Sequence, residues 1–254
     1  MTEIIIGLVA GLLIGLTGVG VGSVMTALLV VLTPISTLTA VGTSLAVGTV
    51  TKMIGVWEHQ RFDRVNWKLA GYLLAGSLPG TALGGLLLNN FKGQVSALQL
   101  DSYLNFGLAF TMVATALAVL IFRGRKAQAA PAASTRTFSP RQAIAIGLGV
   151  GILVSLTSIG SGSVTLLLLF LLVSLPAADL VGTEIFYGLV TVASAAALHL
   201  WMGHVDGTLW LKLLVGSVPG VVMGSRLSGF LSEKGYGWIY AALYISIAAR
   251  LVIR

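Results

Sequence analysis

Long apolar runs fill most of the chain, and the short segments between them carry most of the charged residues. Many of these runs approach or exceed the roughly 18 residues that a helix needs to cross the hydrocarbon core of a bilayer. They lack the polar outer face that the helices of a soluble bundle would show. The pattern predicts an all-α polytopic membrane bundle of about eight hydrophobic elements: Ile4–Thr33, Thr37–Trp57, Trp67–Leu88, Leu98–Phe122, Gln142–Leu175, Asp179–Met202, Thr208–Leu231 and Trp238–Ile253.

Three phrases of the sequence recur 140 positions further along the chain. The pairs are Leu16–Val24 with Leu156–Val164, Val41–Thr43 with Val181–Thr183, and Ser77–Gly80 with Ser217–Gly220. One offset shared by three separate phrases predicts a duplicated unit. We therefore expect a first repeat over 1–122, a linker over 123–141 and a second repeat over 142–254. The first element of each repeat is interrupted by glycine and serine, and we expect unwound backbone over Gly18–Ser23 and Ser158–Ser163. Matching interruptions of this kind are typical of a transporter substrate site.

The composition supports this class, since 56% of the residues are apolar and 9% are charged. The segment 123–141 contains five basic residues and no acid. It is expected to be a flexible cytoplasmic linker under the positive-inside rule, so the net charge of +7 requires no nucleic-acid partner. The start of the chain lacks a basic segment of the signal-peptide type, and the first run is expected to stay in the mature protein. We expect a multi-pass protein of the cytoplasmic (inner) membrane.

Two topologies remain open at this point. Ile4–Leu16 has 13 residues, about 20 Å of helix at ~1.5 Å per residue, which is too short to span the membrane alone. If each broken element re-enters as a hairpin, each half has three crossings and the halves are inverted. If it crosses as one interrupted helix, each half has four crossings and the halves are parallel. The basic loop around Arg61 and Arg64 favours inversion, whereas Arg250 and Arg254 favour eight spans.

The repeated glycine- and hydroxyl-rich phrase suits a site for an anion. Glycine leaves the helical conformation at low cost, and unwound backbone is tolerated at membrane depth where it lines a cavity or is buried in protein. A helix that restarts after the break presents free N–H groups and the positive end of its dipole. The predicted substrate-binding residues are Thr17, Gly18, Gly20, Gly22, Ser23, Thr43, Ser44, Thr157, Ser158, Gly160, Ser161, Gly162, Ser163 and Thr183. They would form a pocket without a fixed cation, and close helix packing by small residues is the plainer alternative.

Ionisable residues inside the apolar runs are few, so each is a candidate functional group. Glu184 follows the repeated Val181–Thr183 phrase and is a candidate proton carrier, with helix capping as the alternative. Lys52 lies near the end of its predicted helix, where it can extend to the interface or line the pathway. We expect surface or interfacial positions for His59, His199 and His204. The histidine spacing and the absence of cysteine predict no metal site and no cofactor.

The chain resembles the TauE/SafE family of sulfite and organosulfonate exporters. The similarity rests on Gly18–Ser23, Ser158–Ser163, Ala40–Ser44 and Leu83–Gly85, and on the four-element pattern repeated around a basic linker. This chain departs from the usual glycine triplet of that family. Glycine and valine alternate over Gly18–Gly22, and the second copy, Ser158–Ser163, contains serines. The resemblance implies secondary transport of a small sulfur-containing anion by a lipid-embedded protein.

Four other functions are alternatives: an anion channel, a transporter of another small anion or metabolite, a membrane-embedded enzyme and a purely structural subunit. A structural subunit would not require matching helix breaks in both halves. The enzyme is disfavoured because the sequence lacks a nucleophile–base or metal constellation. The oligomeric state is left open, a homo-oligomer included.

Overall fold

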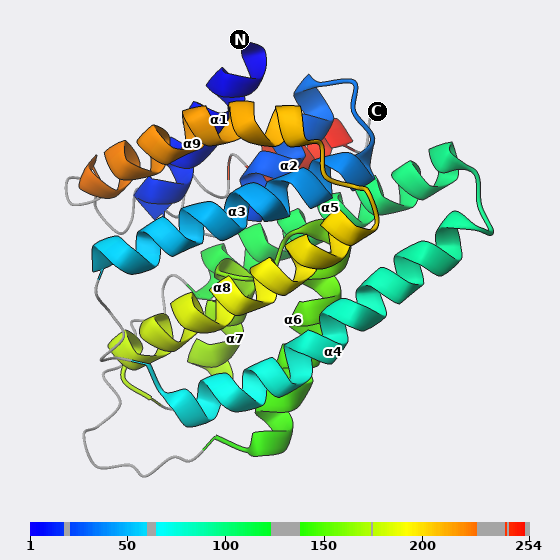
Figure 1. Ribbon diagram of the computed structural model, residues 1–254. Helices are drawn as coiled ribbons and strands as arrows, with labels where there is room; N and C mark the ends of the chain where they lie inside the picture. Colours follow the sequence, from blue (N-terminus) through cyan, green and yellow to red (C-terminus); the bar gives the residue numbers. More distant parts are fainter. Residues whose placement is uncertain are drawn as a thin grey trace.

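A computed structural model describes residues 1–17, 21–59, 65–122, 138–173, 175–227, 242 and 244–251. Within these ranges the chain forms helices and no strand, which confirms the all-α bundle (Figure 1). The helices are α1 (Thr2–Thr17), α2 (Val21–Leu32), α3 (Thr37–His59), α4 (Trp67–Lys92), α5 (Ala97–Phe122), α6 (Pro140–Thr157), α7 (Ser163–Leu172), α8 (Ala177–Trp201) and α9 (Gly207–Leu227). Residues 244–251 form a further helical stretch. These bounds follow the predicted runs, with a division inside the first element of each half.

The starts of α4 and α9 are capped in the same way, 140 positions apart. The Asn66 and Asp206 side chains each accept a hydrogen bond from the amide three residues on, at 3.0 and 2.9 Å. Such caps satisfy N–H groups that have no partner within the helix. The amide of Asn66 donates to Thr183 Oγ1 at 2.9 Å, and the amide of Asp206 donates to Thr43 Oγ1 at 3.2 Å. Each cap is therefore held by a residue from the other half of the chain.

Glycines allow two pairs of helices, α1 with α9 and α4 with α6, to approach closely. A Cβ atom on Gly11 would lie 2.8 Å from Cα of Ser217, and one on Gly151 would lie 2.8 Å from Cα of Ser77. These two contacts are again related by 140 positions, and each joins one half to the other. Gly7 lies against Leu213, four residues before the Gly11 contact on both helices, so α1 and α9 run in the same direction.

Helices α3 and α8 occupy equivalent places in the two halves and run antiparallel. The start of α3 lies at the end of α8, where Gly42 packs against His199. Lys52, near the end of α3, contacts Glu184, near the start of α8. Figure 1 shows the two helices side by side with opposite directions. Equivalent helices that point in opposite directions are the geometry of inverted halves, the first of the two topologies left open by the sequence.

The two broken elements each return to the end of the bundle from which they enter. We call the ends of the bundle the His204 end and the Asn66 end. The first holds the starts of α3 and α9 and the end of α4, and the second holds the starts of α4 and α8. Helix α1 starts beside α9 and is followed by α2, which leads back to α3 at the same end. Helix α6 starts beside α4, with Ile144 against Gly76, and α7 leads back to α8. This is the arrangement of two re-entrant hairpins.

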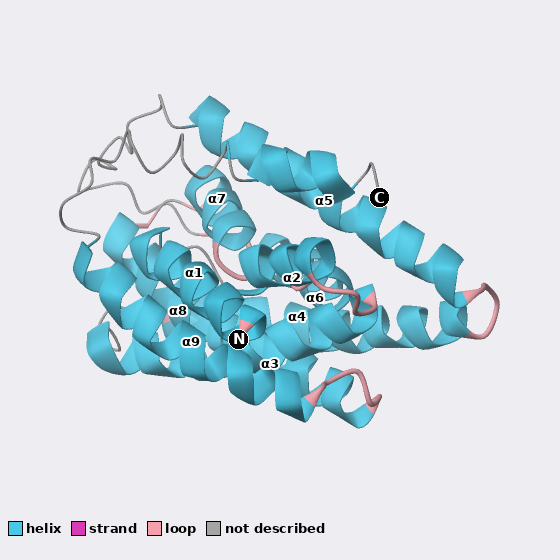
Figure 2. Ribbon diagram, turned by 90° about the horizontal axis from the view of Figure 1, so that it is seen from above, coloured by secondary structure: helices cyan, strands magenta, loops and turns pink. Residues whose placement is uncertain are grey.

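Among the described residues, four helices are long and apolar enough to cross a membrane by length and composition: α4, α6, α8 (as Asp179–Trp201) and α9. Helix α6 meets this length with 18 residues, yet α7 turns the chain back. Large apolar side chains such as Leu86, Phe106, Phe110 and Leu211 are exposed on the outside of the bundle. A lipid environment accounts for this apolar outer surface. Figure 2 shows the arrangement of the helices in a view turned by 90° from that of Figure 1.

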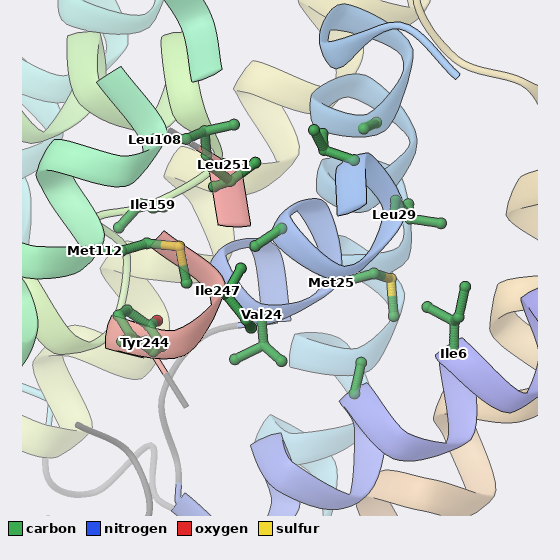
Figure 3. Packing of buried hydrophobic residues seen from close by; sticks show 14 of the residues in the cluster. Ile6, Val24, Met25, Leu29, Leu108, Met112, Ile159, Tyr244, Ile247 and Leu251 are labelled. Carbon is green, nitrogen blue, oxygen red and sulfur yellow. The ribbon is translucent and has the colours of Figure 1, made fainter. Parts of the chain in front are cut away.

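A cluster of buried apolar side chains packs around the two hairpins. Ile159, in the second break, belongs to the cluster together with Leu108 and Met112 of α5 and Tyr244 of the last helical stretch (Figure 3). Met25 of α2 lies in the same cluster. Apolar packing thus surrounds the breaks on this side. The division of the chain at residues 122 and 142 stays a prediction, and the linker lies mostly outside the described residues.

Candidate functional site

The second repeated phrase interrupts a helix, as the sequence predicted. Helix α6 ends at Thr157 and α7 starts at Ser163. Ser158 has a φ of 62°, in the left-handed region, and Gly160 and Gly162 have φ values of 134° and 123°. Serine takes a left-handed conformation at a cost that glycine avoids. The backbone of this phrase therefore cannot continue the helix, and the break is built by three residues of positive φ.

Hydrogen bonds within the break hold it in a defined shape. The amide and the hydroxyl of Thr165 both donate to the Gly160 carbonyl, at 3.1 and 2.8 Å. The Leu166 amide donates to the Gly162 carbonyl at 2.9 Å, and the Ile159 amide donates to Thr157 Oγ1 at 3.2 Å. These bonds use amides on either side of the start of α7. The amides of Ser163 and Val164 lie between these bonded amides, in the first turn of α7, where a helix has no acceptor of its own.

The first repeated phrase faces the second. A Cβ atom on Gly22 would collide with the Ser158 hydroxyl and carbonyl, and it would lie 3.0 Å from the Ser158 Cβ. The hydroxyl of Ser158 is buried and has no hydrogen-bond partner among the described residues. The two phrases therefore meet at this contact. The predicted unwinding over Gly18–Ser23 is partly wrong, because α2 already begins at Val21 and includes Gly22 and Ser23.

Several predicted site residues lie outside what the structure describes. Gly18 and Gly20 are outside the described residues altogether, as are the side chains of Thr17, Ser23 and Ser163. Their roles stay predictions.

The other predicted hydroxyls are buried in the protein. Thr157 Oγ1 donates to the Leu153 carbonyl at 2.7 Å, and Ser161 is 5% exposed within the break. Ser44 is fully buried, and its hydroxyl lacks a hydrogen-bond partner in the described part of the chain. Thr43 and Thr183 are also fully buried and accept the amides of the helix caps. Their hydroxyls hold the frame of the bundle, and a substrate contact by either one stays a prediction.

Glu184 forms a buried ion pair with Lys52. Lys52 Nζ lies 3.1 Å from Glu184 Oε1, and the side chains are 13% and 3% exposed. The interfacial alternative for Lys52 is therefore wrong, because Glu184 holds its ammonium group inside the bundle. The capping alternative for Glu184 also fails, since its carboxylate bonds to a side chain of α3. The sequence did not predict this pair, because it is the antiparallel packing of the equivalent helices that places residue 52 opposite residue 184.

Hydroxyl groups continue from Glu184 along the same face of α8. Tyr187, Thr191 and Ser194 follow at helical spacing, and with Glu184 we call them the α8 polar row. Thr191 Oγ1 lies 2.9 Å from Ser77 Oγ, and Ser194 Oγ lies 3.5 Å from Thr81 Oγ1, both across the contact with α4. This row was not predicted, because its members are scattered through an apolar run.

Two histidines form a second polar cluster at the His204 end. The rings of His199 and His204 lie 5.3 Å apart, and His204 Nε2 is 3.2 Å from Lys92 Nζ. His199 Nε2 donates to the Ser155 carbonyl at 2.9 Å. The surface positions expected for both histidines are wrong, since they are 0% and 7% exposed. The side chain of His59 lies outside the described residues.

The environment of His204 disfavours its protonated form. Burial, the neighbouring His199 and the charge of Lys92 lower the pKa of His204 from 6.5 to about 4. Among the described residues, no group of three or more His, Asp or Glu side chains is arranged to bind a metal. A hollow of about 640 Å³ lies along the end of α4, between Leu83 and Gln94, and none of the predicted site residues lines it.

Comparison with known proteins decides the family. The family described as sulfite exporter TauE/SafE matches residues 4–251. The chain belongs to the TauE/SafE family. Membership in TauE/SafE confirms the resemblance noted from the repeated phrases, and it makes the chain a multi-pass membrane transporter.

Two relatives from Bacillus subtilis (strain 168) carry matching descriptions. The probable membrane transporter protein YjnA is 36% identical over 254 residues, which cover 98% of each chain. The probable membrane transporter protein YdhB is 27% identical over 234 residues, covering 92% of each chain. No solved structure matches the chain. The TauE/SafE assignment therefore spans both halves and both breaks.

Proposed function

We propose that this TauE/SafE protein is a secondary transporter that exports a small sulfur-containing anion, such as sulfite or an organosulfonate, across the cytoplasmic membrane. The family description supports the substrate class. The contact that carries the proposal is that between Gly22 and Ser158, because it brings together two interrupted helices from opposite halves. Interrupted helices that meet in this way form the substrate sites of inverted-repeat transporters.

The anion binds between the start of α7 and the start of α2. The amides of Ser163 and Val164 and the dipole of α7 supply a partial positive charge. The Ser158 hydroxyl is a buried donor that needs a partner, and an oxyanion provides one. The hydroxyls of Thr17, Ser23, Ser161 and Ser163 complete the pocket. Glu184 carries a proton in exchange for, or together with, the anion.

Sulfite flux in proteoliposomes tests the site. Ser158→Gly removes the hydroxyl and keeps a residue that accepts the left-handed backbone. Loss of one buried hydrogen-bond donor costs about 1–3 kcal/mol, so we expect KM for sulfite to rise roughly 5- to 150-fold. Ser102→Ala is the matched control, because that hydroxyl is exposed and bonds to its own helix at Leu98.

The outcomes separate the competing functions. Saturable sulfite flux that weakens in Ser158→Gly and persists in Ser102→Ala supports the proposed site. Unchanged KM in Ser158→Gly places the substrate elsewhere. An anion channel is indicated if the flux does not saturate with sulfite concentration and sulfite never accumulates against its electrochemical gradient. Saturable flux of another anion, without sulfite flux, identifies a transporter with a different substrate.

A further inference from the structure

The ion pair between Lys52 and Glu184 lies deep in the bundle, where a pair of charges is expensive to hold. Both partners are largely shielded from solvent, at 13% and 3% exposure. Desolvation of two charges offsets most of their attraction, so a buried pair is weak evidence for a stabilising role. By contrast, the ion pair between Glu3 and Lys212 is well exposed, at 30% and 45%.

The equivalent positions in the other half carry no charge. Lys52 corresponds to Val192 and Glu184 corresponds to Ser44 at the 140-residue offset. The helices α3 and α8 thus pack with charges at one side of their crossing and with a valine and a serine at the other. The same architecture is built without charges at Val192 and Ser44, which points to a function for the charged side.

The packing leaves room for the lysine to sit beside the helix backbone. A Cβ atom on Gly188 would collide with Lys52 Nζ and would lie 2.6 Å from Glu184 Oε1. Glycine at this position lets the ammonium group approach α8, one turn after Glu184. The Lys52 stem is long and flexible, so its ammonium can leave the carboxylate for another anion nearby.

Hydroxyl groups connect this pair to the second break. The Tyr187 side chain is fully buried, and its hydroxyl has no hydrogen-bond partner among the described residues. It lies near the hydroxyl of Thr165, which itself donates to the Gly160 carbonyl of the break. Tyr187 follows Glu184 by one turn of α8. A buried hydroxyl with Ser77, Thr191 and Thr165 as its neighbours therefore lies between the ion pair and the proposed anion site.

We propose that Lys52 is the fixed positive charge that binds the transported anion, and that Glu184 is its counter-ion when the site is empty. This inference rests on the proposed function and deepens it. The incoming anion replaces Glu184 at the ammonium group of Lys52, and the Tyr187 hydroxyl donates to the same anion. The sequence-based expectation of a pocket without a fixed cation is replaced by one with a single lysine.

Displacement of Lys52 leaves the Glu184 carboxylate buried without a counter-charge, which is costly. Among the described residues, Lys52 of α3 bonds to Glu184, and Tyr187 follows it on α8 with the hydroxyls of Ser77, Thr191 and Thr165 nearby. In the part of the chain that the structure describes, Lys52 is the cation bonded to Glu184. The proton that Glu184 is proposed to carry offsets the cost of leaving its carboxylate unpaired, and release of the anion lets the ion pair re-form.

The test compares binding and flux of sulfite in four proteins: the native protein, E184Q, the neutral double variant K52M/E184Q and the exchanged variant K52E/E184K. The double variant avoids a lone buried charge, and the exchanged variant keeps an ion pair with its charges reversed. Sulfite binding is measured by the rise in the unfolding temperature of purified protein. Flux is measured in proteoliposomes with and without a pH gradient.

We expect E184Q to bind sulfite at least as tightly as the native protein, because Lys52 is free, and to lose the dependence of flux on the pH gradient. The double variant should fold and bind sulfite about 10-fold more weakly or worse, as expected for loss of a charged hydrogen-bond donor. The exchanged variant should fold and fail to transport. If either of these two variants binds and transports sulfite like the native protein, the pair is structural and the inference is overturned.

Failure of the proposed function gives a different result. If the native protein neither binds nor transports sulfite, the proposed substrate is wrong. Thiosulfate, taurine and chloride then replace sulfite in the binding measurement. The inference on Lys52 stands if one of these compounds stabilises the native protein and not the double variant. It is overturned if none of them separates the two.

Discussion

At Ser158 a serine holds a left-handed backbone conformation while its side chain touches the other half of the chain. Both features depend on Gly22, whose lack of a side chain leaves room for the Ser158 hydroxyl and carbonyl. The proposed substrate site therefore depends on a residue with no functional group of its own.

Gly22→Ala tests this dependence. The added methyl group would overlap Ser158, so the two breaks must separate or the break must deform. We expect a lower unfolding temperature, with a loss on the order of 1–3 kcal/mol, and strongly reduced flux. Gly107→Ala is the control, because the nearest atom to its added Cβ lies 4.0 Å away. A Gly22→Ala protein with native flux and native unfolding temperature would contradict the described contact.

His204 gives a prediction for pH. It lies between α8 and α9, and its lowered pKa means that the folded protein resists protonation of this ring. The unfolded chain, with a histidine pKa near 6.5, binds the proton more readily. Stability is therefore fully present above about pH 6.5 and falls as the pH drops towards about 4. His204→Gln should flatten the unfolding temperature over this interval; an equally steep decline in both proteins would assign the loss to other groups.

The sequence marked Ser158 and Glu184 as candidate functional residues, but it could not predict their partners. A serine next to glycines in an apolar run indicates a break from composition alone. Glu184 and Lys52 are 132 residues apart along the chain, so their pairing depends on the packing of α3 against α8. The same limit explains why the burial of His199 was not predicted. This histidine lies near the end of α8 and is covered by neighbouring helices, which the sequence of α8 does not reveal.

At the scale of helices, the close packing of α1 with α9 and of α4 with α6 depends on glycine at every crossing point. Gly149 and Gly151 of α6 show the difference between the two faces of one helix. No atom lies within 4 Å of a Cβ placed on Gly149, whereas a Cβ on Gly151 meets the backbone of Ser77.

Two alanine substitutions on α6 should therefore have opposite effects. Gly151→Ala forces α4 and α6 apart, and we expect a loss of about 1–3 kcal/mol in stability. Gly149→Ala has open space and better helix propensity, so we expect a gain of up to about 1 kcal/mol. Thermal unfolding in detergent measures both. Equal effects of the two substitutions would mean that α4 does not pack against this face of α6.

Helix boundaries followed well from the apolar pattern, because the runs are long and the interruptions are short. The extent of each break was harder to predict. The sequence grouped Gly22 and Ser23 with the unwound segment, whereas the helix restarts at Val21. Glycine lowers the cost of leaving a helix but does not force it, and packing of α2 against its neighbours decides where the helix resumes.

At the scale of the whole molecule, the antiparallel arrangement of α3 and α8 supports inverted halves. Lys68 and Thr208 are the second residues of α4 and α9, are both exposed, and are equivalent at the 140-residue offset. Inversion places them on opposite sides of the membrane.

Cysteine labelling tests this placement without background, since the native chain has no cysteine. We expect a membrane-impermeant maleimide to label Lys68→Cys in inside-out vesicles and Thr208→Cys in right-side-out vesicles. Lys68 is assigned to the cytoplasmic face because the basic linker leads into the same end of the bundle. Labelling of both positions from one side would restore the parallel arrangement.

The charges of the sequence could not choose between the two topologies, because basic residues occur at both ends of the bundle. Arg250 lies in the last helical stretch, and the positive-inside rule applied to it alone would favour eight spans. The direction of α3 relative to α8 is a property of tertiary packing, and the contacts of Gly42 and Lys52 with α8 determine it.

The crossed helix caps have a consequence for how the protein is made. Asn66 is held by Thr183 and Asp206 by Thr43, so the start of α4 gains its partner after more than 100 further residues have been synthesised. The ribosome therefore delivers a first half whose interior surfaces are still uncovered in the membrane. Insertion of the second half supplies the missing partner of each helix cap. The two halves therefore fold as a single cooperative unit.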